Sequence, residues 1–289
     1  MKFSIIANPD KYSIKEPFFN VIEWCNVNGK TLLINRKIAD YFPEAIKAPS
    51  VRIVADEKRS VSDADIVIAI GGDGTMLHTA HIVKEYKTPV LGINTGKLGF
   101  MANVQPSEIE SALSHVSGGQ YRVDRRNMLQ ATDGIGKTYY ALNEFLFSKR
   151  DSSSMISLEV EYDGELINNY WADGLIVSSP TGSTAYNLSA GGPIVLPGTP
   201  VMVLTPITPH TLTTRPLVLP SDRTITVRST DENDNVLFSY DGIVLPHNSK
   251  LDINIIQSDF SVYLIQLPDQ NYFETLRNKL MWGLDKRKI

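Results

Sequence analysis

Two patterns of hydrophobic and polar positions divide the chain. In about the first 115 residues, short apolar runs alternate with segments whose apolar residues recur at helical spacing. The runs are mostly β-branched and nearly continuous in hydrophobicity, as is typical of strands covered on both faces of a parallel sheet. We expect strands at Phe3–Ala7, Thr31–Ile34, Val51–Val54, Ile66–Ile70 and Val90–Ile93.

Helical spacing is clearest in three segments of this half. The first contains Pro17-Phe18-Phe19, Val21-Ile22 and Trp24-Cys25. The others are Thr75–Tyr86 and Glu108–Val116, the latter ending just before a glycine pair, as helices often do. Strands that alternate with helices predict a doubly wound, Rossmann-like α/β domain with a mainly parallel sheet.

Helices nearly vanish in the second pattern, from Gln120 to about Leu267. Short alternating segments replace them, and Asp163-Gly164 between two runs signals a hairpin turn. We expect strands at Ser157–Tyr162, Leu175–Ser178, Val201–Thr205, Thr224–Ser229, Val236–Tyr240, Leu251–Ile256 and Ser261–Leu267. This half is predicted to be an all-β sandwich.

A last helix is expected at Tyr272–Leu284, returning to the first domain, with the basic residues Lys286-Arg287-Lys288 in solvent. The predicted domains are therefore residues 1–119 together with 270–289, and residues 120–269.

Composition narrows the class of protein. With 289 residues, 42% hydrophobic and 21% charged, the chain is neither disordered nor of low complexity. A net charge of −4 argues against nucleic acid as the main partner. One cysteine, Cys25, permits neither a disulfide framework nor a Cys-based metal site within the chain, and we interpret it as a buried filler. No apolar run is long enough for a signal peptide core or a membrane span, so we expect a cytoplasmic protein without membrane contact.

A glycine-rich turn is the first candidate for chemistry. Gly71, Gly72, Asp73, Gly74 and Thr75 follow a predicted strand and open a predicted helix. Glycines permit close approach of a phosphate, and the free N–H groups and dipole of a helix N-terminus attract it. A carboxylate here suits a cation or the proton of an attacking hydroxyl; the alternative is that Asp73 only caps the helix.

The sequence does not match two other phosphate-binding motifs. Leu77 stands where a Rossmann fingerprint needs its third glycine, and no Gly-Lys pair completes a Walker A loop. Lys97 follows another strand end and faces the same crevice if the sheet is parallel, so it is a candidate phosphate ligand. The alternative is a solvated loop lysine.

The second candidate is a hydroxyl-rich segment in the β half. Residues 173–193 read DGLIVSSPTGSTAYNLSAGGP. Hydroxyls and backbone amides there can bind a ribose or an amide, and Tyr186 can stack on a flat ring. A Ser/Thr-rich loop with a capping role is the alternative.

Taken together, four motifs resemble those of the NAD kinases, in their short bacterial form. They are GGDGT at residues 71–75, Asn143-Glu144, the block at 173–193 and PITPHTLTTRP at 206–216. GGDGT alone is shared with relatives of diacylglycerol, sphingosine and 6-phosphofructokinases, whereas the PTGSTAY block is highly specific. The resemblance covers nearly the whole chain.

The resemblance implies transfer of the γ-phosphoryl of ATP to the 2′-hydroxyl of the adenosine ribose of NAD. Asp73 matches the family's general base, and Gly71, Gly72, Gly74 and Thr75 match the cradle for the donor phosphates. Mg²⁺ or another divalent cation would accompany ATP, without a metal cage built by the protein. The positions matching NAD contacts are Asp73, Gly74, His78, Asn143, Glu144, Asp173, Thr181, Thr184, Ala185, Tyr186, Asn187, Leu188 and Ser189.

The resemblance also implies a homodimer or homotetramer, with Asp173 often reaching the nicotinamide across a subunit boundary. One position departs from many relatives: Trp171 stands where they have an arginine. A kinase of lipids or sphingoid bases is a rival interpretation, but no basic amphipathic helix supports it. A non-catalytic NADP sensor on the same fold is a second rival.

Overall fold

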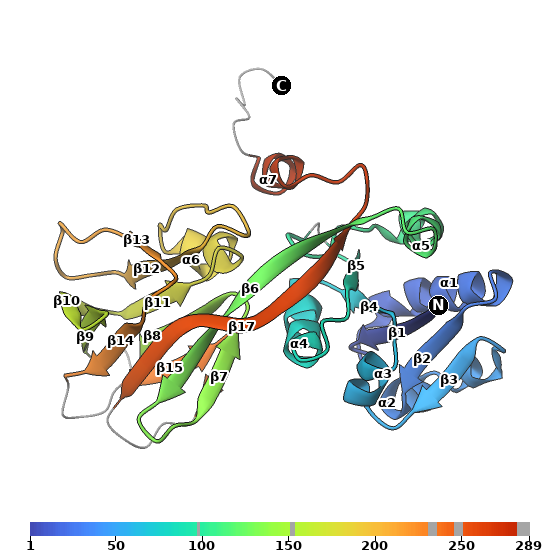
Figure 1. Ribbon diagram of the computed structural model, residues 1–289, viewed down its shortest axis with the longest axis horizontal. Coiled ribbons are helices and arrows are strands. Elements are labelled where there is room, and N and C mark those ends of the chain that lie inside the picture. Colours follow the sequence, from blue (N-terminus) through green and yellow to red (C-terminus); the bar gives the residue numbers. More distant parts are fainter. Residues whose placement is uncertain (97–98, 151–153, 231–235, 246–250, 282–289) are drawn as a thin grey trace. The chain divides into compact units, whose positions relative to one another are not determined.

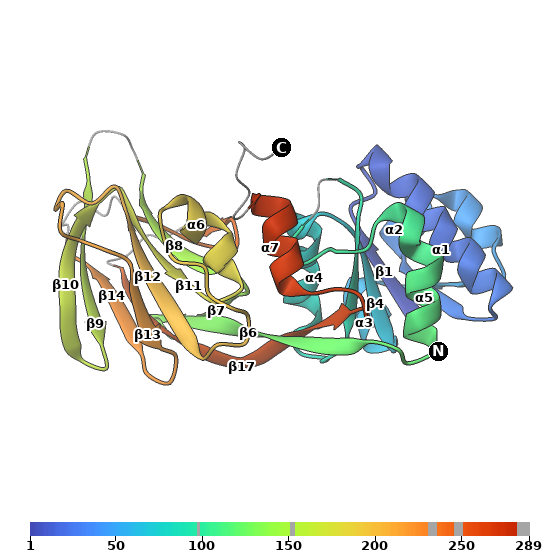
Figure 2. The same ribbon diagram turned by 90° about the horizontal axis from the view of Figure 1, so that it is seen from above.

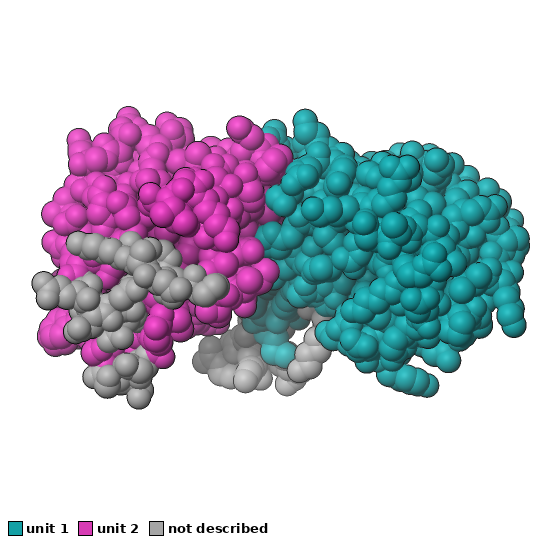
Figure 3. Space-filling view, turned by 90° about the horizontal axis from the view of Figure 1, so that it is seen from below, with its two compact units in different colours: residues 1–125, 262–289 teal, residues 126–261 magenta. Residues whose placement is uncertain are grey.

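The structure, a computed structural model, describes residues 1–96, 99–150, 154–230, 236–245 and 251–281. The chain forms two compact units (Figure 3), residues 1–125 with 262–289 and residues 126–261. Each unit has its own hydrophobic core.

A parallel sheet forms the centre of the first unit, with strand order β5-β4-β1-β2-β3. Its register is parallel throughout, and Leu264 of β17 (Asp252–Gln266) pairs parallel to Val90 at the β5 edge. Helices α1 and α5 pack together on one face, and α3 and α4 on the other (Figure 1, Figure 2). The elements are β1 (Lys2–Ala7), α1 (Lys15–Val27), β2 (Thr31–Asn35), α2 (Arg36–Tyr41), β3 (Val51–Val54), α3 (Glu57–Ser62), β4 (Ile66–Gly71), α4 (Asp73–Val83), β5 (Val90–Asn94), α5 (Ile109–Ser117) and α7 (Tyr272–Leu280).

The predicted α/β pattern of this unit is confirmed. All five expected strands are present, and β4 and β5 are buried along their whole lengths, as strands covered on both faces must be. Helix α4 begins at Asp73, two residues before the expected start, because Gly72 is its N-cap. Cys25 is buried, and this burial raises the pKa of its thiol to about 12, which fits a filler.

Two antiparallel sheets form the second unit. One has the order β13-β12-β11-β8-β15-β16, and the other contains β10-β9-β14-β17 with β6 and β7. Their facing side chains share one core, in which Phe238 stacks on Phe145 and Phe147 at 5.6 and 5.1 Å between ring centroids. The elements are β6 (Arg122–Asp133), β7 (Thr138–Ala141), β8 (Glu144–Lys149), β9 (Ile156–Tyr162), β10 (Glu165–Ala172), β11 (Gly174–Ser178), α6 (Tyr186–Ser189), β12 (Val201–Ile207), β13 (Leu217–Pro220), β14 (Ile225–Ser229), β15 (Val236–Tyr240), β16 (Ile243–Leu245) and β17 (Asp252–Gln266).

This antiparallel unit confirms the expected all-β half and its hairpin. Asp163 and Gly164 both have positive φ, 55° and 82°, and join β9 to β10. One prediction was wrong: the strands expected at Leu251–Ile256 and Ser261–Leu267 are a single strand, β17. The strand continues through residues 257–260, which lie between the two expected segments, so no turn separates them.

The expected C-terminal helix is present as α7, which belongs to the first unit. It ends at Leu280, and Met281 has the left-handed φ of 52°. Residues 282–284 of the expected helix and residues 286–288 of the basic tail lie outside the described residues. None of the described helices has the length and apolar character needed to cross a membrane.

Candidate functional site

The glycine turn joins the carboxyl end of β4 to α4. Gly71 is the last residue of the strand and Asp73 is the first residue of the helix. A Cβ at Gly71 would collide with the Thr75 side chain, so this position requires glycine. The backbone N–H of Thr75 donates to the Gly72 carbonyl at 2.9 Å, which closes the first turn of α4. The helix N-terminus therefore lies at the strand end, as an anion site requires.

The Asp73 side chain is held by three donors of the same unit. The backbone N–H groups of Phe100 and Met101 donate to its Oδ2 and Oδ1, each at 3.2 Å. The Lys279 ammonium lies 2.9 Å from Oδ2. Gly99 leaves space for this arrangement, because a Cβ there would meet the carboxylate. Gly72, and not Asp73, is the N-cap of α4, and the Asp73 carboxylate has a fixed orientation.

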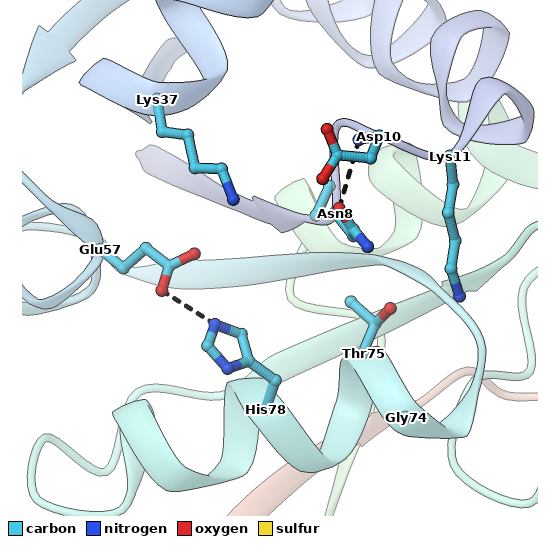
Figure 4. Close-up of a pocket in the computed structure, with 9 residues that line it drawn as sticks. Asn8, Asp10, Lys11, Lys37, Glu57, Gly74, Thr75 and His78 are labelled. Carbon is cyan, nitrogen blue, oxygen red and sulfur yellow. Dashed lines mark hydrogen bonds and ion pairs between the residues drawn. The ribbon is translucent and has the colours of Figure 1, made fainter.

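A cavity of about 450 Å³ opens beside the turn (Figure 4). Loops and helices that follow the sheet's strands supply its wall, and Figure 4 shows Lys37 and Lys11 reaching into it. The Nε2 of His78 lies 2.9 Å from Glu57, and this hydrogen bond raises the pKa of His78 against the opposing effect of burial. The lining residues are Ala7, Asn8, Asp10, Lys11, Lys37, Glu57, Gly74, Thr75 and His78.

The chain's motifs had indicated only three residues of this cavity, Gly74, Thr75 and His78. Asn8, Asp10 and Lys11 follow the end of β1, and Lys37 lies in the first turn of α2, after β2. The sequence did contain a signal for these residues, because each follows the end of a predicted strand. Ligands of open α/β sheets bind outside the carboxyl ends of strands. Lys97, the phosphate ligand that we had considered, lies outside the described residues.

In the second unit, Asn143 and Glu144 stand at the start of β8, held by Asp241. The Asp241 carboxylate accepts the backbone N–H groups of Leu142 and Asn143 at 2.8 Å and of Glu144 at 3.3 Å. Burial, and after it the charge of Asp241, raise the pKa of the Glu144 carboxyl to about 8. Its Oε2 is buried and has no hydrogen-bond partner among the described residues. Sequence reasoning missed Asp241, which no motif marks.

Asp173 lies between β10 and β11 and forms an ion pair with Lys149. The Lys149 Nζ is 2.6 Å from the Asp173 carboxylate, and the Lys149 backbone N–H donates to the Asp173 carbonyl. Both side chains are about 30% exposed, at 29% and 30%, so a ligand can still reach the carboxylate. Lys149 is another residue that the motifs did not indicate.

The hydroxyl-rich segment forms a compact turn after β11. Tyr186 and Ser189 are exposed, Thr184, Ala185 and Leu188 are half-buried, and Thr181 is buried. Asn187 is fully buried: its amide donates to the Ser183 and Pro193 carbonyls, and its Oδ1 accepts from the Thr205 hydroxyl at 2.6 Å. The Asn187 side chain thus holds the loop, while the Tyr186 side chain is exposed.

Trp171, the position at which we expected a departure from the family pattern, lies on β10 and is half exposed. Its ring lies 4.4 Å from the His210 ring between centroids, and its carbonyl accepts the His210 N–H. The predicted site residues thus form two groups. Gly71–Thr75 and His78 lie in the first unit, and the residues from Asn143 to Ser189 lie in the second.

Comparison with known proteins places these residues in a family. The model of the ATP-NAD kinase N-terminal domain matches residues 3–121, and that of the C-terminal domain matches residues 142–267. The chain belongs to the NAD kinase family. Like other NAD kinases, it is a phosphotransferase, and the family reaction is the ATP-dependent phosphorylation of NAD.

Relatives match over most of the chain. The NAD kinase of Bacteroides fragilis is 38% identical over 99% of this chain and 100% of its own length. That of Cytophaga hutchinsonii is 40% identical over 88% of this chain and 89% of its own.

Two solved NAD kinase folds are similar. Yeast NADH kinase, complexed with NADH, has a TM-score of 0.91 at 24% identity, covering 100% of this chain and 90% of its own. The NAD kinase from Archaeoglobus fulgidus, in complex with ATP, has a TM-score of 0.73 at 23% identity, covering 96% and 99%. These two likenesses concern the fold.

Proposed function

We propose that the chain transfers the γ-phosphoryl group of ATP to the 2′-hydroxyl of the adenosine ribose of NAD, with Asp73 as the general base. The observation that carries this proposal is the fixed Asp73 carboxylate on the first turn of α4, the helix whose Gly74 and Thr75 line the cavity that Lys11 and Lys37 enter. A general base and a phosphate-binding turn at the same helix N-terminus are suited to the transfer of a phosphoryl group to a hydroxyl.

The donor phosphates occupy the cavity in this proposal. Gly71, Gly72, Gly74 and Thr75 offer the helix N-terminus, and Lys11 and Lys37 supply positive charge. No group of three or more His, Cys, Asp or Glu side chains able to hold a metal occurs in the part of the chain described. The Asp10 and Glu57 carboxylates of the cavity nevertheless suit Mg²⁺, which typically binds one or two carboxylates together with substrate phosphates. Bound with ATP, Mg²⁺ would neutralise developing charge on the phosphates.

In the transfer step, the 2′-oxygen of the ribose forms a bond to the γ-phosphorus. The bond from that phosphorus to the β,γ-bridging oxygen breaks, and its electron pair stays on ADP. The hydroxyl proton passes to the Asp73 carboxylate. General-base catalysis of this kind typically raises the rate by about 10²–10⁴-fold.

The NAD side of the proposal rests on the second unit. The Glu144 Oε2 has no partner in the described part of the chain, and the pKa of the carboxyl is raised. Both favour a protonated acid at neutral pH, able to donate to an acceptor of the adenosine moiety. Asp173 and the exposed Tyr186 ring offer contacts to the nicotinamide end. The other proposed NAD contacts of this unit are Asn143, Thr181, Thr184, Ala185, Leu188 and Ser189, with Asn187 supporting the loop. The proposed contacts of the first unit are Asp73, Gly74 and His78. Yeast NADH kinase, which shares the fold, was solved with NADH, and this supports a dinucleotide site.

The test is an end-point assay with NAD, ATP and Mg²⁺, in which an NADP-specific dehydrogenase detects the product. Asp73→Asn is expected to lower kcat by at least about 100-fold while the Kd of NAD changes little. Asp40→Asn, at an exposed position of α2, is the matched control. Wild-type turnover in Asp73→Asn would contradict the base role. NADP binding without turnover in the wild type would favour a sensor.

Two further expectations belong to this proposal. The chain is expected to form a homodimer or homotetramer, which light scattering during size-exclusion chromatography measures. Cytoplasmic localisation is also expected, and fractionation of cells that express the chain tests it.

A further inference from the structure

An ion pair joins the proposed base to the C-terminal helix. The Lys279 ammonium of α7 lies 2.9 Å from the Asp73 Oδ2, across 206 residues of sequence. Both side chains are largely shielded, at 28% and 33% exposed. The family models match residues 3–121 and 142–267, so α7 lies outside both matches.

Packing specifies where Lys279 lies. Asn271 caps α7 by accepting the Glu274 N–H at 2.8 Å, and Leu276 is buried. The Lys279 ammonium lies 4.3 Å from the centroid of the Phe100 ring, a distance at which a cation is attracted to an aromatic face. Phe100 is also one of the two residues whose N–H groups bind Asp73. Lys279 is therefore part of the same local arrangement as the carboxylate.

The donors around Asp73 are unevenly divided between its two oxygens. Oδ2 accepts from Phe100 and Lys279, whereas Oδ1 accepts from Met101. Each carboxylate oxygen has about two acceptor positions, so the contacts made by the described residues fill those of Oδ2 and leave one on Oδ1. A hydroxyl that approaches Asp73 would thus donate to Oδ1.

Charge gives Lys279 a second effect. A carboxylate beside a phosphate cradle repels the donor phosphates, and a cation in contact with it offsets that repulsion. This compensation of the Asp73 charge is strongest where the two groups are shielded from water, because water then screens their interaction less.

We propose that Lys279 is a positioning residue for phosphoryl transfer. Its ammonium holds Oδ2 so that Oδ1 faces the acceptor hydroxyl, and it offsets the Asp73 charge as the donor phosphate arrives. This inference rests on the proposed function of Asp73.

The test compares Lys279→Met, Lys279→Arg and the control Arg277→Met, an exposed cation on the same helix. Lys279→Met is expected to lower kcat at least about tenfold, since misplacing a reacting group can cost about 100-fold. The KM for NAD and the melting temperature should stay near wild type. Lys279→Arg should recover most of the kcat, and Arg277→Met should match the wild type.

A double-mutant cycle separates positioning from a structural role. If Lys279 acts through Asp73, Lys279→Met should cost little further activity in an Asp73→Asn background. Equal losses in both backgrounds, or a kcat of Lys279→Met at or above wild type, would overturn the inference. A wild-type protein that forms no NADP would instead refute the proposed function.

Discussion

Asp241 lies against Glu144: its carboxylate accepts the Glu144 backbone N–H at 3.3 Å, and its charge adds to burial in raising the pKa of the Glu144 carboxyl to about 8. The ordinary value for this group is 4.5. Between these values the folded protein binds a proton that the unfolded chain releases, so folding is increasingly disfavoured as the pH rises. The Asn143-Glu144 turn therefore makes stability dependent on pH.

Glu144→Gln tests this dependence. The wild type should lose up to about 1.4 kcal/mol in its free energy of unfolding per pH unit as the pH rises through this window towards 8, because Glu144 ionises in the unfolded chain while the buried carboxyl keeps its proton. Glutamine cannot ionise, so the variant should lack this component and gain stability relative to the wild type above pH 8. Urea unfolding from pH 5 to 9 measures both curves. Glu165→Gln, at an exposed position of β10, should follow the wild type; a Glu144→Gln curve parallel to the wild type would refute the assignment.

Asp241→Asn tests how the turn is held. Asp241 has a left-handed φ of 45°, which asparagine tolerates, so the backbone conformation should survive. The amide offers one acceptor oxygen where three N–H groups need two, and an unsatisfied buried donor costs about 1–3 kcal/mol. We expect urea unfolding to show this decrease in the free energy of unfolding. We also expect steady-state assays to show a higher KM for NAD. Asp259→Asn, at an exposed position of β17, controls for the loss of a carboxylate. If Asp241→Asn has the same urea midpoint as the wild type, the hydrogen bonds of the Asp241 carboxylate contribute nothing to stability.

Much of the fold follows from local pattern. The β-branched runs of the first unit predict its parallel strands because such strands are buried on both faces. The Asp163-Gly164 pair predicts a hairpin because both positions need positive φ. The length of β17 escaped prediction because the mainly polar residues at its middle have the composition of a turn. The partners of β17 are β5, β6 and β14, which are separate from it in sequence, so no local pattern reveals the pairing.

The candidate site was only partly visible in the sequence, for a related reason. Motifs mark residues that are close together in the chain, such as Gly71–Thr75. Asp241 lies 97 residues from Glu144 and Lys279 lies 206 from Asp73, and no local pattern distinguishes either from other charged residues. Lys37 and Glu57 enter the cavity from separate helices, so only the strand order brings them together.

Gly99→Ala tests the orientation of Asp73. A Cβ at Gly99 would meet the Asp73 carboxylate, whereas one at Gly96 would have 3.9 Å to the Asn94 Oδ1. Displacing the carboxylate should lower kcat by up to about 100-fold, since small misplacements of reacting groups are that costly. Steady-state assays of Gly99→Ala and the control Gly96→Ala, with circular dichroism of both, measure the effect. Equal activity in the two variants would mean that the orientation of Asp73 is unimportant.

Lys37→Met tests whether the cavity holds the donor phosphates. Lys37 reaches into the cavity near His78 (Figure 4), and hydrogen bonds to charged groups are worth about 1.5–3 kcal/mol, so the KM for ATP should rise by about 10–100-fold. Lys58→Met, at an exposed position of α3, is the charge-matched control. Inorganic triphosphate separates phosphate binding from adenine binding: its inhibition constant should rise by the same factor as the KM for ATP, and that for adenosine should not. If triphosphate inhibits Lys37→Met and the wild type equally, the donor phosphates bind elsewhere.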